Sequence, residues 1–209
     1  MIGYASRTGT RRNLEALRGA GWHLLISATG VHRNEGFPYG IDNGAWTAFQ
    51  AGEDWDAEAY RGRFETLLTT HGEDADWIAV PDIVQGGMAS LAVSERWLET
   101  LRDELPGQTL LIPVQDGMST TDLAPYLDEL TGIFVGGSTE WKEATMHIWG
   151  ALCREHSAWL HVGRVNSRRR IRLCAQAGAD SFDGTSVSRF AKTLPRLDAE
   201  RRQQSLVFA

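Results

Sequence analysis

The sequence has only two cysteines and no long apolar run, and each shortage excludes a class of protein. Among its 209 residues, Cys153 and Cys174 are too few for a disulfide framework or a cysteine-rich zinc site. No stretch approaches the roughly 18 apolar residues of a membrane span. Residues 1–12 lack the apolar core of a signal peptide. We therefore expect a cytoplasmic protein with no membrane contact.

Motifs for common cofactors and metals are missing as well. The chain has no GxGxxG segment and no Walker loop. Its six histidines include no HxH pair and no pair spaced four residues apart. We therefore expect neither a resident cofactor nor a metal ion.

The charge balance does not indicate a nucleic-acid-binding protein, but the arginines are clustered. The net charge is −6. Screening limits the reach of each charge to about 8–10 Å, so local patches decide contact with phosphate. An arginine run on a helix is most often a solvated face, and this alternative stays open. The clusters are Arg11-Arg12, Arg164, Arg168-Arg169-Arg170, Arg172, Arg189 and Arg201-Arg202.

Short apolar runs alternate with helix-like segments along the whole chain. Such alternation indicates an α/β protein whose strands pair in parallel through right-handed crossovers. We predict a single compact (β/α)8 barrel domain over residues 1–209. An open doubly wound sheet remains the alternative, since alternation does not prove closure. The expected strands are 2–4, 22–28, 39–41, 77–80, 109–114, 133–135, 159–162 and 179–182, and the expected helices include 11–18, 56–70, 122–130, 139–154 and 167–177.

Polar residues or glycines follow most of these apolar runs. In a (β/α) barrel the carboxyl ends of the strands meet at one mouth, where the chemistry of such enzymes takes place. We therefore expect one concave site there. Its segments are Asp42-Asn43-Gly44, Pro81-Asp82, Gln115-Asp116-Gly117, Gly136-Gly137-Ser138, His161-Val162-Gly163-Arg164 and Ser181-Phe182-Asp183-Gly184.

Three carboxylates in these segments are candidates for catalysis. Asp42 and Asp183 could each be a turn residue, because Asn-Gly and Asp-Gly are common turn dipeptides, and Asp82 could cap the next helix. Carboxylates that converge on one mouth raise one another's pKa and divide into acid and base roles. Their shared position favours a functional reading over three independent turns.

The remaining strand ends carry groups suited to binding. Gln115 would either recognise a ligand or satisfy a loop, because a buried amide needs partners. Gly136 and Gly137 would let a flat ligand approach the backbone, or form an ordinary turn. A histidine such as His161 more often packs than binds. Arg168-Arg169-Arg170, at a helix start after the seventh strand, lies where barrels commonly bind phosphate.

Taken in order, five segments resemble the guanine transglycosylase superfamily. Its members are tRNA enzymes that exchange guanine for a 7-deazaguanine, and phage and bacterial relatives that do so in DNA. The resemblance runs from Asp42 to Asp183. The small, phage-encoded DNA-type members are most similar at residues 43–46, 136–142 and 161–167. The five segments are 41–46, 80–82, 113–117, 134–138 and 181–184.

The resemblance implies a pentosyltransferase that works by double displacement. Asp183 would be the nucleophile that attacks C1′, and Asp42 the general acid and base. Asp82 and Gln115 would read the guanine edge, although Gln85 stands in a segment that copies the tRNA enzymes' glutamine motif.

Further substrate contacts follow from the same reading. Gly136 and Gly137 would offer backbone contacts to the base, with His161 nearby. The nucleic acid itself would lie on five arginines: Arg164, Arg168, Arg169, Arg170 and Arg189.

One departure changes the expected polymer. The tRNA enzymes carry a C-terminal zinc site that helps to hold RNA, and nothing like it precedes Ala209. We therefore expect DNA rather than tRNA, and a free 7-deazaguanine base as the second substrate. A phage-encoded protein would act in the host cytoplasm, and the sequence leaves a homodimer or a partner subunit open.

Two other functions fit the same residues. One is a metal-free barrel enzyme that acts on a small sugar phosphate, with Asp42 and Asp183 as acid and base. The other is a non-catalytic relative that only binds nucleic acid.

Overall fold

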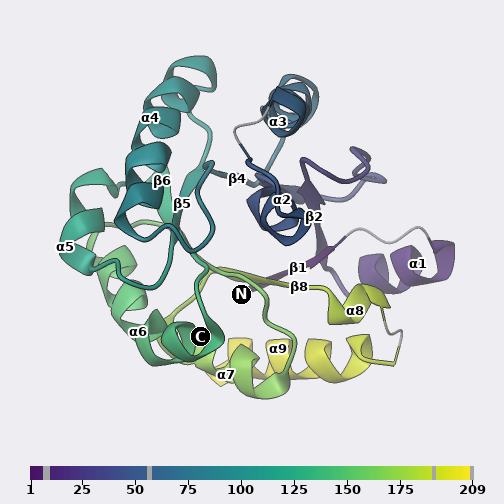
Figure 1. The fold of residues 1–209 in the computed structure, drawn as a ribbon. Helices are drawn as coiled ribbons and strands as arrows, with labels where there is room; N and C mark the ends of the chain where they lie inside the picture. The colour runs from purple at the N-terminus through teal and green to yellow at the C-terminus, as the bar shows by residue number, and fades with distance from the viewer. Residues whose placement is uncertain (7–9, 56–57, 190–191, 208–209) are drawn as a thin grey trace.

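Eight parallel strands form a closed barrel in the computed structural model, which describes residues 1–6, 10–55, 58–189 and 192–207 (Figure 1). Each strand pairs with the next along the chain, and the last pairs with the first, with Tyr4 opposite Asp183. The predicted barrel is confirmed and the open sheet is excluded. The strands are β1 (Ile2–Ser6), β2 (His23–Ser27), β3 (Tyr39–Asp42), β4 (Trp77–Ala79), β5 (Leu110–Val114), β6 (Thr131–Val135), β7 (Leu160–Val162) and β8 (Ser181–Gly184).

Helices surround these strands, as Figure 1 shows. The segment 28–38, between β2 and β3, contains no helix. No helix within the described ranges is long and apolar enough to cross a membrane. The helices are α1 (Arg11–Gly19), α2 (Ala45–Ala51), α3 (Glu58–His71), α4 (Met88–Glu104), α5 (Thr120–Leu123), α6 (Thr139–Glu155), α7 (Arg168–Ala177), α8 (Ser186–Arg189) and α9 (Leu194–Val207), with a 3-10 helix, η1 (Ala124–Tyr126), after α5.

The helix expected over 122–130 is wrong at both ends. It begins at Thr120, because Asp122 accepts a hydrogen bond from the backbone N–H of Ser119 at 2.8 Å and caps the first turn. It gives way to η1 at Ala124. The Asp128 carboxylate then accepts from the N–H of Leu130 at 2.8 Å, which bends the chain into β6.

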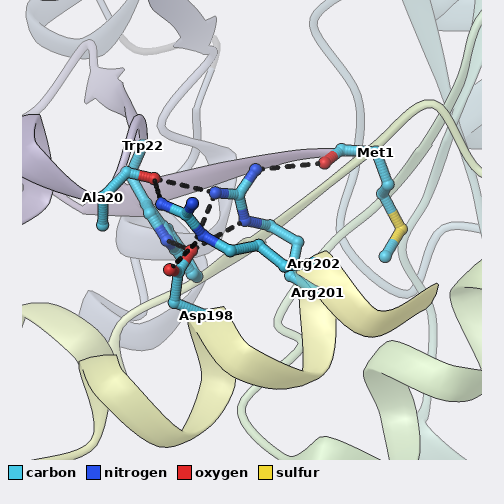
Figure 2. A network of polar contacts seen from close by, with 6 residues as sticks. All are labelled: Met1, Ala20, Trp22, Asp198, Arg201 and Arg202. Carbon is cyan, nitrogen blue, oxygen red and sulfur yellow. Dashed lines mark hydrogen bonds and ion pairs between the residues drawn. The ribbon is translucent and has the colours of Figure 1, made fainter. Parts of the chain in front are cut away.

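The helices α2, α8 and α9 were not foreseen from the sequence. The longest of them, α9, is tied to the beginning of the chain (Figure 2). Asp198 accepts a hydrogen bond from the Trp22 indole at 2.9 Å and forms an ion pair with Arg201 at 2.7 Å. Arg201 also donates to the carbonyl oxygen of Ala20 at 2.8 Å and to that of Met1 at 3.4 Å. These contacts fasten the C-terminal helix beside β1 and β2.

Aromatic rings fill the barrel interior, where branched aliphatic side chains are more usual. Tyr4 and Trp77 are fully buried there, with ring centroids 5.1 Å apart. Space for Trp77 comes from Gly40 on the neighbouring strand, because a Cβ there would lie 2.5 Å from the indole ring. A second apolar cluster fills the layer between the strands and the helices.

Two glycine substitutions test the helix packing. A Cβ on Gly150 of α6 would lie 1.9 Å from the Ala177 carbonyl oxygen at the end of α7. Gly150→Ala should therefore lower the free energy of unfolding by about 1–3 kcal/mol. Gly62→Ala in α3 should raise it by about 0.5–1 kcal/mol, because an added Cβ would meet no other group within 4 Å among the residues that the structure describes. Urea denaturation measures both, and equal stability of Gly150→Ala and the wild type would contradict the close approach of α6 and α7.

Candidate active site

Three carboxylates lie at the carboxyl ends of the strands. Asp42 ends β3, Asp183 lies in β8, and Asp82 follows β4. Burial raises the pKa of Asp42 to about 6, a hydrogen bond from Ser27 opposes the rise, and the charge of Asp183 adds to it. The structure therefore brings Asp42 and Asp183 within electrostatic reach of each other, across the barrel mouth.

Asp82 is coupled to the same group. Burial raises its pKa to about 6, and the Asp42 charge contributes to the rise. Asn43 opposes it by donating a hydrogen bond to Asp82 Oδ1 at 2.9 Å. Asn43 also donates to the Val80 carbonyl at 2.8 Å and accepts from the Ala45 N–H at 2.8 Å. The sequence marked Asn43 only as a turn residue, and its role in joining two loops was missed.

Asp183 is held by two donors on one oxygen. Its Oδ2 lies 3.2 Å from His161 Nε2 and 3.2 Å from the backbone nitrogen of Arg164. Its side chain is almost fully buried. Within the described part of the chain no hydrogen bond to Oδ1 is found, so both of these donors meet the same carboxylate oxygen.

His161 lies below the mouth and is fully buried. Burial lowers its pKa, against the opposing effect of Asp183, so the ring is neutral. Ser181 Oγ accepts from the Trp159 indole at 2.8 Å and can donate its own hydrogen to His161 Nδ1, also at 2.8 Å. The proton of the neutral ring then sits on Nε2 and faces Asp183. In this conformation His161 contacts the carboxylate, whereas the sequence suggested contact with the substrate.

Gln115 satisfies a loop in this structure. It is buried, and its amide nitrogen donates to the Ile83 carbonyl oxygen at 2.8 Å. Gln85 lies on that same loop after β4, exposed and with a φ of 61°. Gln115 is therefore the glutamine that reaches the interior.

The Gly136-Gly137 turn after β6 is fixed by Asp116. The Asp116 carboxylate accepts from the backbone and from the hydroxyl of Ser138, both at 2.7 Å. Burial would raise the Asp116 pKa, but these bonds outweigh it and the pKa is lowered. A Cβ on Gly137 would lie 2.6 Å from Asp116 Oδ2, so only glycine fits there.

Arg164 crosses the mouth. It follows β7, and its guanidinium lies 4.5 Å from the ring centre of Trp46. Trp46 lies in the first turn of α2, which follows β3. Strands 3 and 7 are four places apart in an eight-stranded ring, hence on opposite sides. The Arg164 guanidinium also donates a hydrogen bond to the Gly137 carbonyl oxygen. Trp46 in turn stacks on Phe49 with centroids 5.7 Å apart.

The arginine run at the start of α7 is engaged in ion pairs. Arg168 pairs with Glu200 of α9 at 2.7 Å. Arg170 pairs with Glu143 of α6 at 2.9 Å, and Arg169 pairs with the same carboxylate. Phosphate at this place would compete with two carboxylates.

The rim of the mouth differs from one side to the other. Arg189, at the end of α8 after β8, is exposed. Most exposed large apolar side chains lie on other segments, those after β2, β3 and β4: Val31, Trp46, Phe49, Ile83 and Met88.

Among the residues described, no three His, Cys, Asp or Glu side chains are grouped so as to hold a metal ion.

The raised pKa of Asp42 predicts a stability change with pH. The folded protein holds this proton more tightly than the unfolded chain, whose carboxyl titrates near pH 4. The stability that it contributes is therefore complete below about pH 4 and is lost by about pH 6. Asp42→Asn should be more stable than the wild type at pH 7.5, by about 3 kcal/mol, and equal to it at pH 3.5.

Asp116→Asn is the control of opposite sign. Its lowered pKa means that Asp116 stabilises the fold above the pKa of the unfolded chain, and this contribution is lost as the pH falls. Asp116→Asn should thus be less stable than the wild type at pH 7.5. Urea denaturation at both pH values measures these differences, and an Asp42→Asn variant less stable at pH 7.5 would contradict the assignment.

Comparison with known proteins assigns the chain neither a family nor an activity. No protein-family model matches the chain, and no curated protein matches it. Among solved structures, tryptophan synthase from M. tuberculosis, in an open form with BRD0059 bound, covers 97% of this chain and 90% of its own. Its sequence identity is 16% and its TM-score is 0.48, and nothing about this chain is concluded from so weak a likeness. The resemblance to guanine transglycosylases rests on the sequence motifs.

Proposed function

We propose that the protein is a base-exchange glycosyltransferase that replaces guanine in a polynucleotide, DNA rather than tRNA, by a 7-deazaguanine. The observation that carries this proposal is the pair of coupled carboxylates, Asp183 and Asp42, at the barrel mouth. Asp183 is held by His161 and the Arg164 N–H with one oxygen left over. Asp42 titrates near pH 6 and can exchange a proton at neutral pH.

The proposed reaction has two displacements. Asp183 attacks C1′ of the nucleotide, the bond from C1′ to guanine N9 breaks, and Asp42 gives its proton to the departing base. The incoming 7-deazaguanine then loses its N9 proton to Asp42 and attacks C1′, which releases Asp183. This is the logic of a retaining glycosidase with a covalent intermediate. General acid–base help of this kind contributes about 10²–10⁴-fold.

Asp82 and Gln115 suit the edge of guanine. Guanine presents N1–H and N2–H₂ donors beside its O6 acceptor, and Asp82 can accept from the donors. Gln115 uses its amide nitrogen on Ile83 and keeps its carbonyl oxygen for the base. The backbone of Gly136 and Gly137 lies at the next strand end. Adenine would leave Asp82 with only its hydrogen bond from Asn43, at a cost of about 1–3 kcal/mol relative to guanine.

The two sides of the rim suit a flipped nucleotide in a polymer. A base must leave the stack for chemistry at C1′, and exposed rings such as Trp46 and Phe49 offer stacking surfaces. Arg189, after β8, is exposed and suits phosphate. In this proposal the Arg164 guanidinium leaves the Trp46 ring and turns to phosphate when the nucleotide binds. In this proposal the α7 arginines, Arg168 to Arg170, exchange Glu143 and Glu200 for phosphate when DNA binds.

Exchange of labelled guanine or 7-deazaguanine with DNA is the decisive assay. Asp183→Asn should lose at least about 10³-fold in rate, because the amide cannot form the glycosyl ester. Asp128→Asn, at the turn before β6, is the matched control and should keep wild-type activity. An Asp183→Asn variant with more than a few per cent of wild-type activity would contradict the nucleophile assignment. DNA binding without exchange would favour the non-catalytic relative, and turnover of a sugar phosphate the small-molecule enzyme.

The arginines should set the salt dependence of DNA binding. Arg164→Ala and Arg189→Ala should each lower the slope of log K against log salt by about 1 without changing base choice. The combined Arg168→Ala, Arg169→Ala and Arg170→Ala variant should lower it further. Arg61→Ala, on the outer face of α3, is the control and should leave the slope unchanged. A triple variant that binds like the wild type at low salt would show that this run is only a solvated helix face.

A further inference from the structure

Lys142 occupies a core position of α6, where a charged side chain is costly. It is 4% exposed and belongs to the buried stripe of the helix, with Met146, Trp149 and Cys153. Burial lowers its pKa to about 8. The double displacement uses no amine, so the fold keeps a buried lysine beside the site without an assigned purpose.

The ammonium group of Lys142 donates to the Gly163 carbonyl oxygen. The nitrogen on the other side of this peptide bond belongs to Arg164, and its N–H points at Asp183 Oδ2, 3.2 Å away. The carbonyl and the N–H of one trans peptide point in opposite directions in a rigid plane. Lys142, the 163–164 peptide and Asp183 therefore form one chain of hydrogen bonds.

The backbone at this peptide is strained. Arg164 has a φ of 58°, in the left-handed region that side-chain-bearing residues rarely adopt. Residue 163 has no room for a side chain, because a Cβ on Gly163 would lie 2.7 Å from the Phe134 ring and 3.3 Å from Asp183 Oδ2. A rotation of the peptide would relieve Arg164 and turn the N–H away from Asp183. Something must hold the strained orientation.

We propose that Lys142 is a positioning residue that holds the Gly163–Arg164 peptide with its N–H on Asp183 Oδ2, which leaves Oδ1 oriented for attack. Its contribution to catalysis rests on the proposed function of Asp183, whereas its effect on the peptide does not. The titratable and charged groups that face Lys142 are Asp183 and His161 inside the barrel, Arg164 on the loop after β7, and Cys174 and Arg170 on α7.

The hydrogen-bond chain can be measured by NMR without any assay of activity. In the wild type, the Arg164 amide ¹⁵N and ¹H shifts should follow the titration of Asp183, and this dependence should disappear in Asp183→Asn. Near pH 8 the Gly163 carbonyl ¹³C shift and the Arg164 amide should move together as Lys142 loses its proton. The proposal would be overturned if the Arg164 amide shifts responded neither to Asp183 nor to the change of Lys142 near pH 8. This test needs no substitution at Lys142.

Lys142→Met keeps the size of the side chain and removes the donor. In this variant the Arg164 amide should exchange with solvent at least tenfold faster and should no longer report Asp183. Met146→Ala, one turn further along α6, is the control: it should lower the melting temperature as well, but leave the Arg164 amide as in the wild type. An Arg164 amide that stays protected in Lys142→Met would overturn the proposal.

A second substitution checks the strain. Glycine adopts a φ near 58° freely. Adding Arg164→Gly to Lys142→Met should therefore restore protection of the residue-164 amide at least in part. A purely structural role for Lys142 would give no such rescue.

Base exchange adds a separate measurement. Lys142→Met should lower kcat about 10- to 100-fold with little change in KM, because the lysine acts on the nucleophile and not on the base. If the wild type exchanges no base while the amide results hold, the proposed function fails and the positioning role stands. If the wild type exchanges bases and Lys142→Met keeps its kcat, the positioning role fails alone.

Discussion

The packing of His161 between two aromatic rings is the contact on which the candidate site depends. Its ring lies 4.5 Å from the Trp77 centroid and 4.6 Å from that of Phe134, with no exposure to solvent. An interior filled by rigid rings cannot shift by fractions of an ångström without loss of contact. The imidazole therefore offers its Nε2 to Asp183 at one fixed place, which holds the carboxylate in one orientation.

The site places charge where the fold is least able to solvate it. Asp42 and Asp82 carry raised pKa values mainly because they are removed from water. Hydrogen bonds from neutral donors such as Asn43 offset this loss of hydration only in part. The carboxyl groups at the mouth therefore bind protons at a higher pH than they would in a solvent-exposed turn. The outer layer is different: α9 is held by well-satisfied ion pairs around Asp198, whose pKa is lowered. The ion pairs of α9 thus stabilise the fold, whereas the buried carboxylates at the barrel mouth destabilise it.

Which carboxylates would meet could be predicted from the sequence, because a parallel barrel brings the carboxyl end of every strand to the same face. Asp42, Asp82 and Asp183 each follow or end an apolar run, and this position is a local property of the chain. A signal for Lys142 was present too: it recurs with Met146 in the apolar spacing of its helix, and a lysine in such a stripe indicates a buried charge. Asn43 gave no such signal, because Asn-Gly occurs in ordinary turns.

The sequence by itself determined the alternation of strands and helices, the barrel class and the strand ends that bear the polar groups, since these follow from local periodicity and turn chemistry. Only the tertiary structure decided the partners. His161 turns inward to Asp183, Arg164 adopts a left-handed backbone and reaches Trp46 across the mouth, and the arginines of α7 pair with carboxylates on other helices. Each of these contacts joins residues far apart in the chain. Their geometry is set by closure of the barrel and by packing between layers, which no local pattern of residues records.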